Sequence, residues 1–363
     1  MKLNGEDAGN NYSRRIAAGL ELADLVLIDK FVQKMAEISV PNEINCSEQV
    51  FSIDFHPIGS FIASGLINGS VEIWQYGEGE HSNRKVLDFK AHNTSCRGIK
   101  FSPGGDTLYS ISSDKSLRGT NGDGGELFVL ANAHSAAINR LELISENALV
   151  TGDDSGAVKL WDVRTLGYDA TPVLEWHLHE DFVSDFAFNS DSSTLVSTSG
   201  DCTYCLYDVR NPANHFRSEQ LENDLHCVEV LGAGGSALFG GEEGLLAAYT
   251  WDQWDGPSRS IPGHSEAVDC MWKIDESTVI TGSSDGLLRV VSLLPNKILG
   301  VIGDHEEFPV EGLSASRDAR LLASFAHDEI VRFWDLGNLS LLEDTHQGGY
   351  EADQNTHFAA GMI

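Results

Sequence analysis

The segment from Leu322 to Asp335 is the most complete copy of a unit that recurs along this chain. Within it, Ile330 to Trp334 is β-branched and aromatic and predicts a strand, and Leu322 to Phe325 predicts the strand before it. A unit of about 40–45 residues that ends in Trp-Asp is typical of a four-stranded propeller blade. Aligning the position of Ser324 backwards gives six more copies, in steps of 41 to 46 residues, at Thr281, Phe239, Ser197, Thr151, Ser110 and Ser64. The sequence therefore predicts an all-β, seven-bladed propeller.

A histidine stands about twenty residues before the aspartate of several copies. In a blade, the loop that enters the first strand and the turn between the second and third strands lie at the same end, so the two side chains can meet. A buried imidazole that binds the aspartate and a strand Ser or Thr, whose hydroxyl reaches the Trp indole, satisfies every polar group that it buries. The one complete set predicted from the sequence is His305, Ser324, Asp328 and Trp334.

The other copies keep only part of this predicted network. The third blade has Ser155 at the usual aspartate position, with Asp153 and Asp154 beside it. The partial sets are His92, Ser110 and Asp114 in the second blade; His134, Thr151 and Trp161 in the third; His179, Ser197 and Asp201 in the fourth; and His264, Thr281 and Asp285 in the sixth.

The same residue types suggest a hydrolase triad as an alternative. A catalytic triad occurs once and needs an oxyanion site, whereas this trio recurs at a fixed period with members missing. The chain also has no glycine-rich phosphate loop and no metal-ligand cluster, and Cys202 and Cys205 would point to opposite faces of a strand. The sequence predicts structural networks, no enzyme and no cofactor.

Domain boundaries follow from the repeat. We expect an N-terminal extension over 1–45, a propeller over 46–345 and a flexible tail over 346–363. Apolar residues at helical spacing predict an amphipathic helix over 16–35, which covers either its own propeller or a partner protein. The ring can close through Leu339–Leu342 or through residues 36–45, and the weakest strand prediction is the third of the second blade, where Thr120 and Asn121 replace Trp-Asp.

Charge and cysteine content bear on partners and compartment. The chain has 55 acidic and 24 basic residues, for a net charge of −31, which disfavours direct nucleic-acid binding and either attracts basic proteins or confers solubility. Its six cysteines form no disulfide framework, and no leader or membrane span is recognisable. We expect an intracellular protein that is a monomer within a larger complex.

The repeats resemble the WD-repeat superfamily, and most of 42–342 is similar to the WD repeat protein 55 family. The resemblance is carried by Asn147–Gly156 with Leu160–Arg164, by Ala267–Met271, by Thr281–Gly286 and by Leu294–Lys297. It implies a non-catalytic nuclear or nucleolar protein needed for ribosomal RNA production and ribosome biogenesis. Animal members carry a basic tail, whereas Asp344–Ile363 has no Lys or Arg, so a cytoplasmic location stays open.

Two blades end in the same extension, which suggests a second function. Trp161-Asp162-Val163-Arg164 and Tyr207-Asp208-Val209-Arg210 resemble the docking box by which many propellers bind the adaptor of cullin-4 ubiquitin ligases. Arg164 and Arg210 are expected near one another on neighbouring blades, as anchors for carboxylates of the adaptor. The alternatives are a substrate receptor of such a ligase, or arginines that only form salt bridges to a neighbouring blade.

Overall fold

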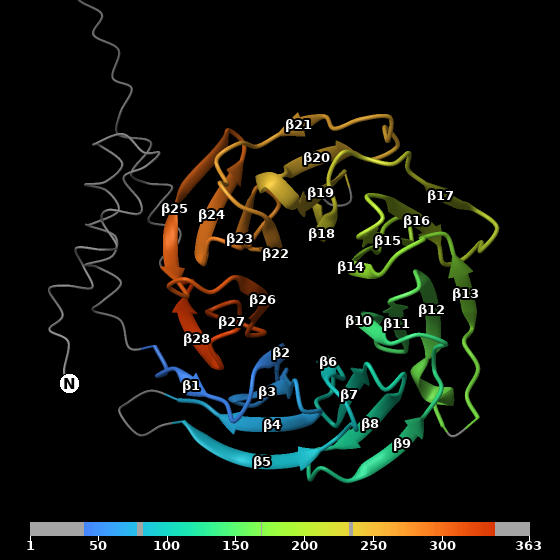
Figure 1. Cartoon of the computed structure of the whole chain (residues 1–363), viewed down its shortest axis with the longest axis vertical. Coiled ribbons are helices and arrows are strands. Elements are labelled where there is room, and N and C mark those ends of the chain that lie inside the picture. The colour runs from blue at the N-terminus through green and yellow to red at the C-terminus, as the bar shows by residue number, and fades with distance from the viewer. Residues whose placement is uncertain (1–39, 78–82, 168, 232–234, 338–363) are drawn as a thin grey trace, which may run out of the picture.

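The computed structural model describes residues 40–77, 83–167, 169–231 and 235–337. Their strands form seven antiparallel four-stranded sheets, which stand around a common centre (Figure 1). The predicted seven-bladed propeller is confirmed. The helix predicted over 16–35, the possible strand Leu339–Leu342 and the tail over 346–363 lie outside the described residues. In the described ranges, no helix is long and apolar enough to cross a membrane.

The first four blades follow one another along the chain, each from its inner to its outer strand. Blade 1 consists of β2 (Val50–Phe55), β3 (Phe61–Leu66), β4 (Ser70–Gln75) and β5 (Arg84–Lys90). Blade 2 consists of β6 (Cys96–Phe101), β7 (Thr107–Ser112), β8 (Leu117–Asn121) and β9 (Glu126–Leu130). Blade 3 consists of β10 (Ile138–Ser145), β11 (Ala148–Asp153), β12 (Ala157–Asp162) and β13 (Leu174–His177), with the 3-10 turn η1 (Val163–Thr165) after β12. Blade 4 consists of β14 (Val183–Asn189), β15 (Thr194–Ser199), β16 (Tyr204–Asp208) and β17 (His215–Arg217).

The last three blades complete the ring. Blade 5 consists of β18 (Leu225–Leu231), β19 (Ser236–Gly241), β20 (Leu246–Thr250) and β21 (Arg259–Ser260), with the 3-10 turn η2 (Glu242–Gly244) before β20. Blade 6 consists of β22 (Val268–Lys273), β23 (Thr278–Ser283), β24 (Leu287–Leu293) and β25 (Asn296–Asp304). Blade 7 consists of β26 (Val310–Ala315), β27 (Leu321–Ala326), β28 (Ile330–Asp335) and, as its outer strand, β1 (Ile44–Asn45).

Burial changes from the second strand of a blade to the outer one. Every residue of β23 is buried, whereas the residues of β5 alternate between exposed and half-buried. A second strand is covered on both faces by the neighbouring sheets, so its sequence is apolar or small throughout, whereas an outer strand has one face in water. The core therefore consists of layers between successive blades, as where Tyr204 of blade 4 stacks on Phe239 of blade 5 at 4.7 Å between ring centroids.

The N-terminal segment closes the ring. In β1, Ile44 pairs with Val331 of β28, and the backbone N–H of Cys46 donates to the carbonyl of Glu329 at 2.9 Å. Ile44 is only 1% exposed and belongs to a core cluster that joins blades 7 and 1. The propeller thus includes residues 44 and 45, which precede the start expected at residue 46. This pairing covers the outer edge of the last sheet, which an open ring would leave unpaired.

Candidate functional site

The network of blade 7 joins the four residues expected from the sequence. The imidazole of His305 lies 2.7 Å from Ser324 Oγ through Nε2 and 3.0 Å from Asp328 Oδ2 through Nδ1. The indole N–H of Trp334 donates to Ser324 Oγ at 2.8 Å. Asp328 also accepts from the guanidinium of Arg332, a contact that the sequence analysis did not anticipate. Each polar atom of this buried set therefore has a partner.

Blade 3 contains a second complete network, which corrects the expectation that only blade 7 has one. His134 Nε2 lies 2.6 Å from Thr151 Oγ1, and the indole of Trp161 donates to the same hydroxyl at 2.8 Å. The carboxylate partner of His134 Nδ1 is Asp153 Oδ2 at 2.9 Å, whereas Ser155 stands at the aligned aspartate position. Asp153 stands two residues before the aligned position and still reaches His134, because it ends β11 and its side chain turns into the blade.

The environment of Asp153 favours the ionised carboxylate. Burial opposes ionisation, but hydrogen bonds from His134, from the hydroxyl of Ser155 and from the backbone N–H of Ala157 outweigh it and lower the pKa of Asp153 to about 2. Burial lowers the pKa of His134, which keeps the imidazole neutral. A neutral imidazole donates from Nδ1 to Asp153 and accepts at Nε2, so the network runs in one direction from Trp161 to the carboxylate.

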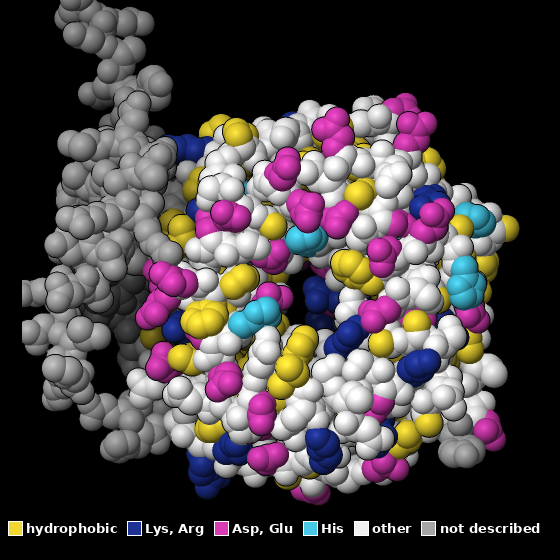
Figure 2. All heavy atoms as spheres, in the orientation of Figure 1, with side chains coloured by type: hydrophobic (Ala, Val, Ile, Leu, Met, Phe, Trp, Pro, Cys, Tyr) yellow, Lys and Arg dark blue, Asp and Glu magenta, His cyan; other side chains and the backbone are white. Residues whose placement is uncertain are grey.

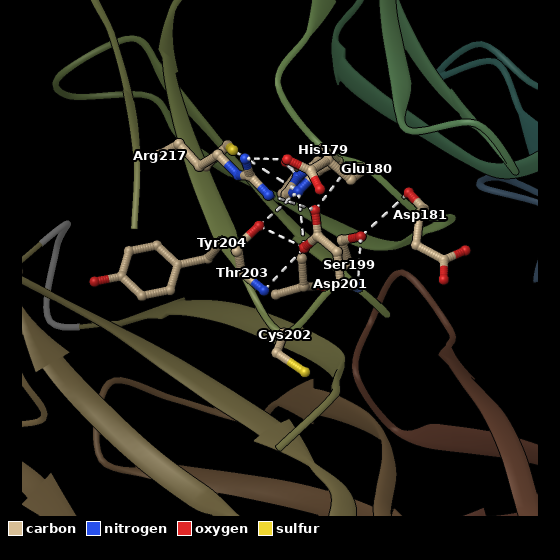
Figure 3. A network of polar contacts seen from close by, with 12 residues as sticks. His179, Glu180, Asp181, Ser199, Asp201, Cys202, Thr203, Tyr204 and Arg217 are labelled. Atoms are coloured by element: carbon tan, nitrogen blue, oxygen red, sulfur yellow. Dashed lines mark hydrogen bonds and ion pairs between the residues drawn. The ribbon is translucent and has the colours of Figure 1, made fainter. Parts of the chain in front are cut away.

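In blades 2 and 4 an additional hydroxyl stands between histidine and aspartate. His92 Nδ1 lies 2.8 Å from Ser116 Oγ, which donates to Asp114, and His179 Nδ1 lies 3.0 Å from Thr203 Oγ1, which donates to Asp201 (Figure 3). The other imidazole nitrogens contact Ser110 at 2.8 Å and Ser197 at 2.6 Å. Sequence reasoning missed both relay residues, although each is a hydroxyl residue two positions after the aspartate.

Tyr207 takes the place of the tryptophan in blade 4. Its phenol accepts from Ser197 Oγ at 3.3 Å, so the tyrosine closes the network in the same position as an indole. The two cysteines of this blade are free thiols, and Cys202 donates to Asp224 whereas Cys205 is buried beside His179. No group of three potential metal ligands occurs in the part of the chain that the structure describes.

The contact expected between His264 and Asp285 in blade 6 does not form. His264 Nε2 reaches Thr281 Oγ1 at 2.9 Å, but its buried Nδ1 has no hydrogen-bond partner among the described residues. Asp285 is held instead by the guanidinium of Arg289, at 2.7 and 3.0 Å, and Leu287 stands where blades 2 and 4 have the relay hydroxyl. Burial and the Arg289 charge lower the pKa of His264 to about 4.

The two predicted docking boxes expose only their arginine ends. Trp161 and Tyr207 are 1% and 0% exposed, so neither side chain can touch a partner protein. Arg164 is 67% exposed in its side chain and binds Asp162 of its own blade, at 2.9 Å from Nε and 2.6 Å from Nη2, rather than a neighbouring blade. The N–H of Arg210 donates to Asp208 at 2.9 Å, and Arg210 is also exposed.

A cavity of about 380 Å³ lies at the centre of the ring, and sequence reasoning did not predict it. Every blade contributes the second residue of its inner strand to the lining: Phe51, Arg97, Asn139, Ser184, His226, Asp269 and Glu311. The other lining residues are Val50, Arg140, Phe182, Phe325 and His327. The sequence does hold a signal for this cavity. In every blade the first strand begins with a buried residue, and the residue after it, which lines the cavity, differs from blade to blade.

The seven sheets and their recurring His/Ser-Thr/Asp networks define this chain as a WD-repeat β-propeller. The model of the WDR55 family matches residues 41–339. The chain is 35% identical over 296 residues to WD repeat-containing protein 55 of Arabidopsis thaliana, covering 81% of this chain and 82% of that protein. It is 33% identical over 303 residues to WD repeat-containing protein 55 of Bos taurus, covering 83% and 78%. It is also 35% identical over 306 residues to WD repeat-containing protein JIP5 of Coprinopsis cinerea, covering 81% and 74%. The chain belongs to the WD repeat protein 55 family.

Proposed function

We propose that this chain is a non-catalytic protein-interaction scaffold that acts in ribosomal RNA production and ribosome biogenesis, in the nucleus and nucleolus. The observation that carries the scaffold part is the burial of the networks: His92, His134, His179, His264 and His305 are between 0 and 9% exposed. A buried histidine whose bonds are made within its blade serves stability, because no substrate can reach it. The surfaces that a partner protein can reach are the central cavity and the exposed strand ends.

The ribosomal part of the proposal rests on the family to which the chain belongs. The net charge of −31 supports partners that are basic proteins, which ribosomal proteins generally are, and argues against direct contact with a phosphate backbone. Asp344–Ile363 contains no Lys or Arg, so nuclear entry would depend on a partner or on another part of the chain. We propose that the protein is a monomer within such a complex.

Affinity purification of the tagged full chain from its own cells, followed by mass spectrometry, tests this proposal. Pre-ribosomal proteins should be enriched over a tagged unrelated propeller of similar net charge, and depletion of the chain should cause ribosomal RNA precursors to accumulate. Equal recovery of basic proteins by both propellers, with normal precursor levels, would contradict it.

A second candidate function is docking on the adaptor of a cullin-4 ubiquitin ligase. The observation that favours it is the exposure of Arg164 and Arg210 at the ends of β12 and β16, which belong to adjacent blades. Each arginine follows an aspartate that binds its backbone N–H, so both turns are built alike. A guanidinium fits a carboxylate of an acidic partner surface, and at Arg164 the partner would replace the exposed contact with Asp162.

The double variant Arg164→Ala/Arg210→Ala separates the two candidates. A matched control is Arg84→Ala/Arg317→Ala, which removes the same charge from exposed positions of blades 1 and 7. Recovery of the adaptor with the intact chain and the control, and its loss with the double variant, would identify a substrate receptor. Recovery of pre-ribosomal factors with all three chains, without the adaptor, would support the scaffold function and exclude the docking function.

A further inference from the structure

The central cavity has charges of opposite sign on its two sides. Blades 2 and 3 contribute Arg97 and Arg140, and blades 6 and 7 contribute Asp269 and Glu311 across from them. Figure 2 shows the same division, with dark blue side chains on one side of the central opening and magenta and cyan ones toward the other. The opening is thus polar, preformed and different on its two sides.

The two arginines are neutralised within the propeller. Arg97 Nη1 lies 2.7 and 2.9 Å from the two carboxylate oxygens of Asp154, and Arg140 Nε lies 2.9 Å from Asp185 Oδ1. Both pairs join neighbouring blades and hold the guanidiniums in place. Their positive charge is therefore already satisfied, and little of it is left for an anionic ligand.

The two acids on the opposite side have weaker partners. Asp269 Oδ1 lies 2.8 Å from His226 Nδ1 and its Oδ2 accepts from Ser284 at 2.6 Å, whereas Glu311 Oε1 lies 3.3 Å from His327 Nε2. Among the described residues, no lysine or arginine forms an ion pair with either carboxylate. The two guanidiniums are balanced by Asp154 and Asp185, their own partners. The carboxylates of Asp269 and Glu311 then remain as excess negative charge at the cavity.

The titration of these groups points the same way. Burial raises the pKa of Glu311, and the neighbouring charge of Asp269 raises it further. The hydrogen bond to Asp269 raises the pKa of His226 against the effect of burial. Burial is the main cause of the shift at Glu311 and the hydrogen bond to Asp269 that of the shift at His226, and the negative charge of Asp269 raises both pKa values.

We propose that the cavity receives one arginine or lysine side chain from an extended segment of a partner protein, with its cationic end between Asp269 and Glu311. This inference rests on the proposed protein-binding function and assigns a site to it. A cavity of about 380 Å³ has room for one long side chain but not for a folded element. Phe51 and Phe325 also line the cavity, and an aromatic ring favours a cation placed over its face.

Peptides of the form acetyl-Gly-Ala-Xaa-Ala-Gly-amide test the proposal on the full chain, where Xaa is arginine, lysine, citrulline or glutamate. The readout is the chemical shift of the imidazoles of His226 and His327, titrated by NMR at physiological salt, where general attraction to the acidic surface is largely screened. The arginine and lysine peptides should shift both imidazoles saturably. Citrulline has nearly the shape of arginine without its charge and should bind about tenfold or more weakly.

The variants Asp269→Asn and Glu311→Gln remove one charge each and keep the side-chain size. Each should weaken binding of the arginine peptide about tenfold, because a close charge pair is lost. Glu266→Gln is the matched control, since Glu266 is exposed, precedes the same strand and does not line the cavity. The Glu266→Gln variant should bind the arginine peptide with the same affinity as the intact chain.

Three results would overturn the proposal. They are equal affinity for the citrulline and arginine peptides, preferential binding of the glutamate peptide, and an unchanged affinity in both cavity variants. The citrulline comparison uses the intact chain and holds even where a variant folds poorly. If these peptides fail while specific proteins still co-purify with the intact chain, the scaffold function stands and only this site is wrong; if no specific protein co-purifies, the scaffold function itself fails.

Discussion

Asp153 Oδ2 lies 2.9 Å from the Nδ1 of His134, although Asp153 stands two residues before the aligned position of the aspartates in blades 2, 4, 6 and 7. The same carboxylate accepts from the backbone N–H of Ala157 and from the hydroxyl of Ser155. Two strand positions can thus supply the acid of one network, provided that the carboxylate reaches the same point in space.

This relationship predicts how two neighbouring substitutions differ. Asp153→Ala should lower the free energy of unfolding by about 2–4 kcal/mol, because it leaves the buried His134 Nδ1 and the turn N–H groups without an acceptor. Ser155→Ala removes one partly exposed hydroxyl bond and should cost about 1 kcal/mol or less. Chemical denaturation of both variants at neutral pH measures the difference. A larger loss of stability from Ser155→Ala would mean that the residue at the aligned position, rather than Asp153, supports the network.

His264 predicts a pH dependence with a definite sign. In the folded chain its pKa is about 4, below the value of 6.5 for an ordinary histidine, so between these values the unfolded state binds more protons. The free energy of unfolding should therefore fall as the pH falls from 6.5 to 4, by about 3 kcal/mol from this residue at most. Above 6.5 the contribution is complete and constant.

The measurement is denaturant unfolding of the intact chain and of His264→Gln over that pH range. The curve of the variant should be flatter, because its side chain does not titrate. Other histidines titrate equally in both chains and cancel in the comparison. Parallel curves would show that His264 is not the group responsible.

The orphan nitrogen of His264 predicts a stabilising substitution. Leu287 occupies the position that corresponds to Ser116 and Thr203, so Leu287→Thr should supply a hydroxyl between His264 Nδ1 and Asp285. Satisfying a buried polar atom is worth about 1 kcal/mol. Leu287→Val has the shape of threonine without the hydroxyl and is the matched control. The threonine variant should be the more stable of the two in chemical denaturation, and equal stability would count against the relay.

The closing strand predicts the effect of truncation. A chain that begins at residue 47 loses the burial of Ile44, worth about 2–3 kcal/mol, and uncovers the outer edge of β28. It should unfold at a lower temperature than a chain that begins at residue 40, and it should associate through the uncovered edge. Thermal unfolding and light scattering check both effects. Equal melting temperatures of the two truncated chains would mean that β1 does not close the ring.

The sequence by itself determined the number of blades, the second and third strands of each, and most histidines and hydroxyls of the networks. These features are local, since a strand is encoded by its own apolar and β-branched residues and a turn by the residues within it. The recurring motifs also indicated the WD-repeat superfamily, and the resemblance of particular stretches such as Asn147–Gly156 and Thr281–Gly286 indicated the WD repeat protein 55 family.

Only the tertiary structure decided which atoms meet. Asp153 rather than Ser155 contacts His134, Arg289 takes Asp285 from His264, and Ile44 rather than residues after the seventh blade pairs with Val331. The central cavity exists because seven residues, each about 43 positions from the next in the sequence, come together around the centre of the ring. Distances of a few tenths of an ångström decide a hydrogen bond, and they depend on how distant segments pack, which no local pattern encodes.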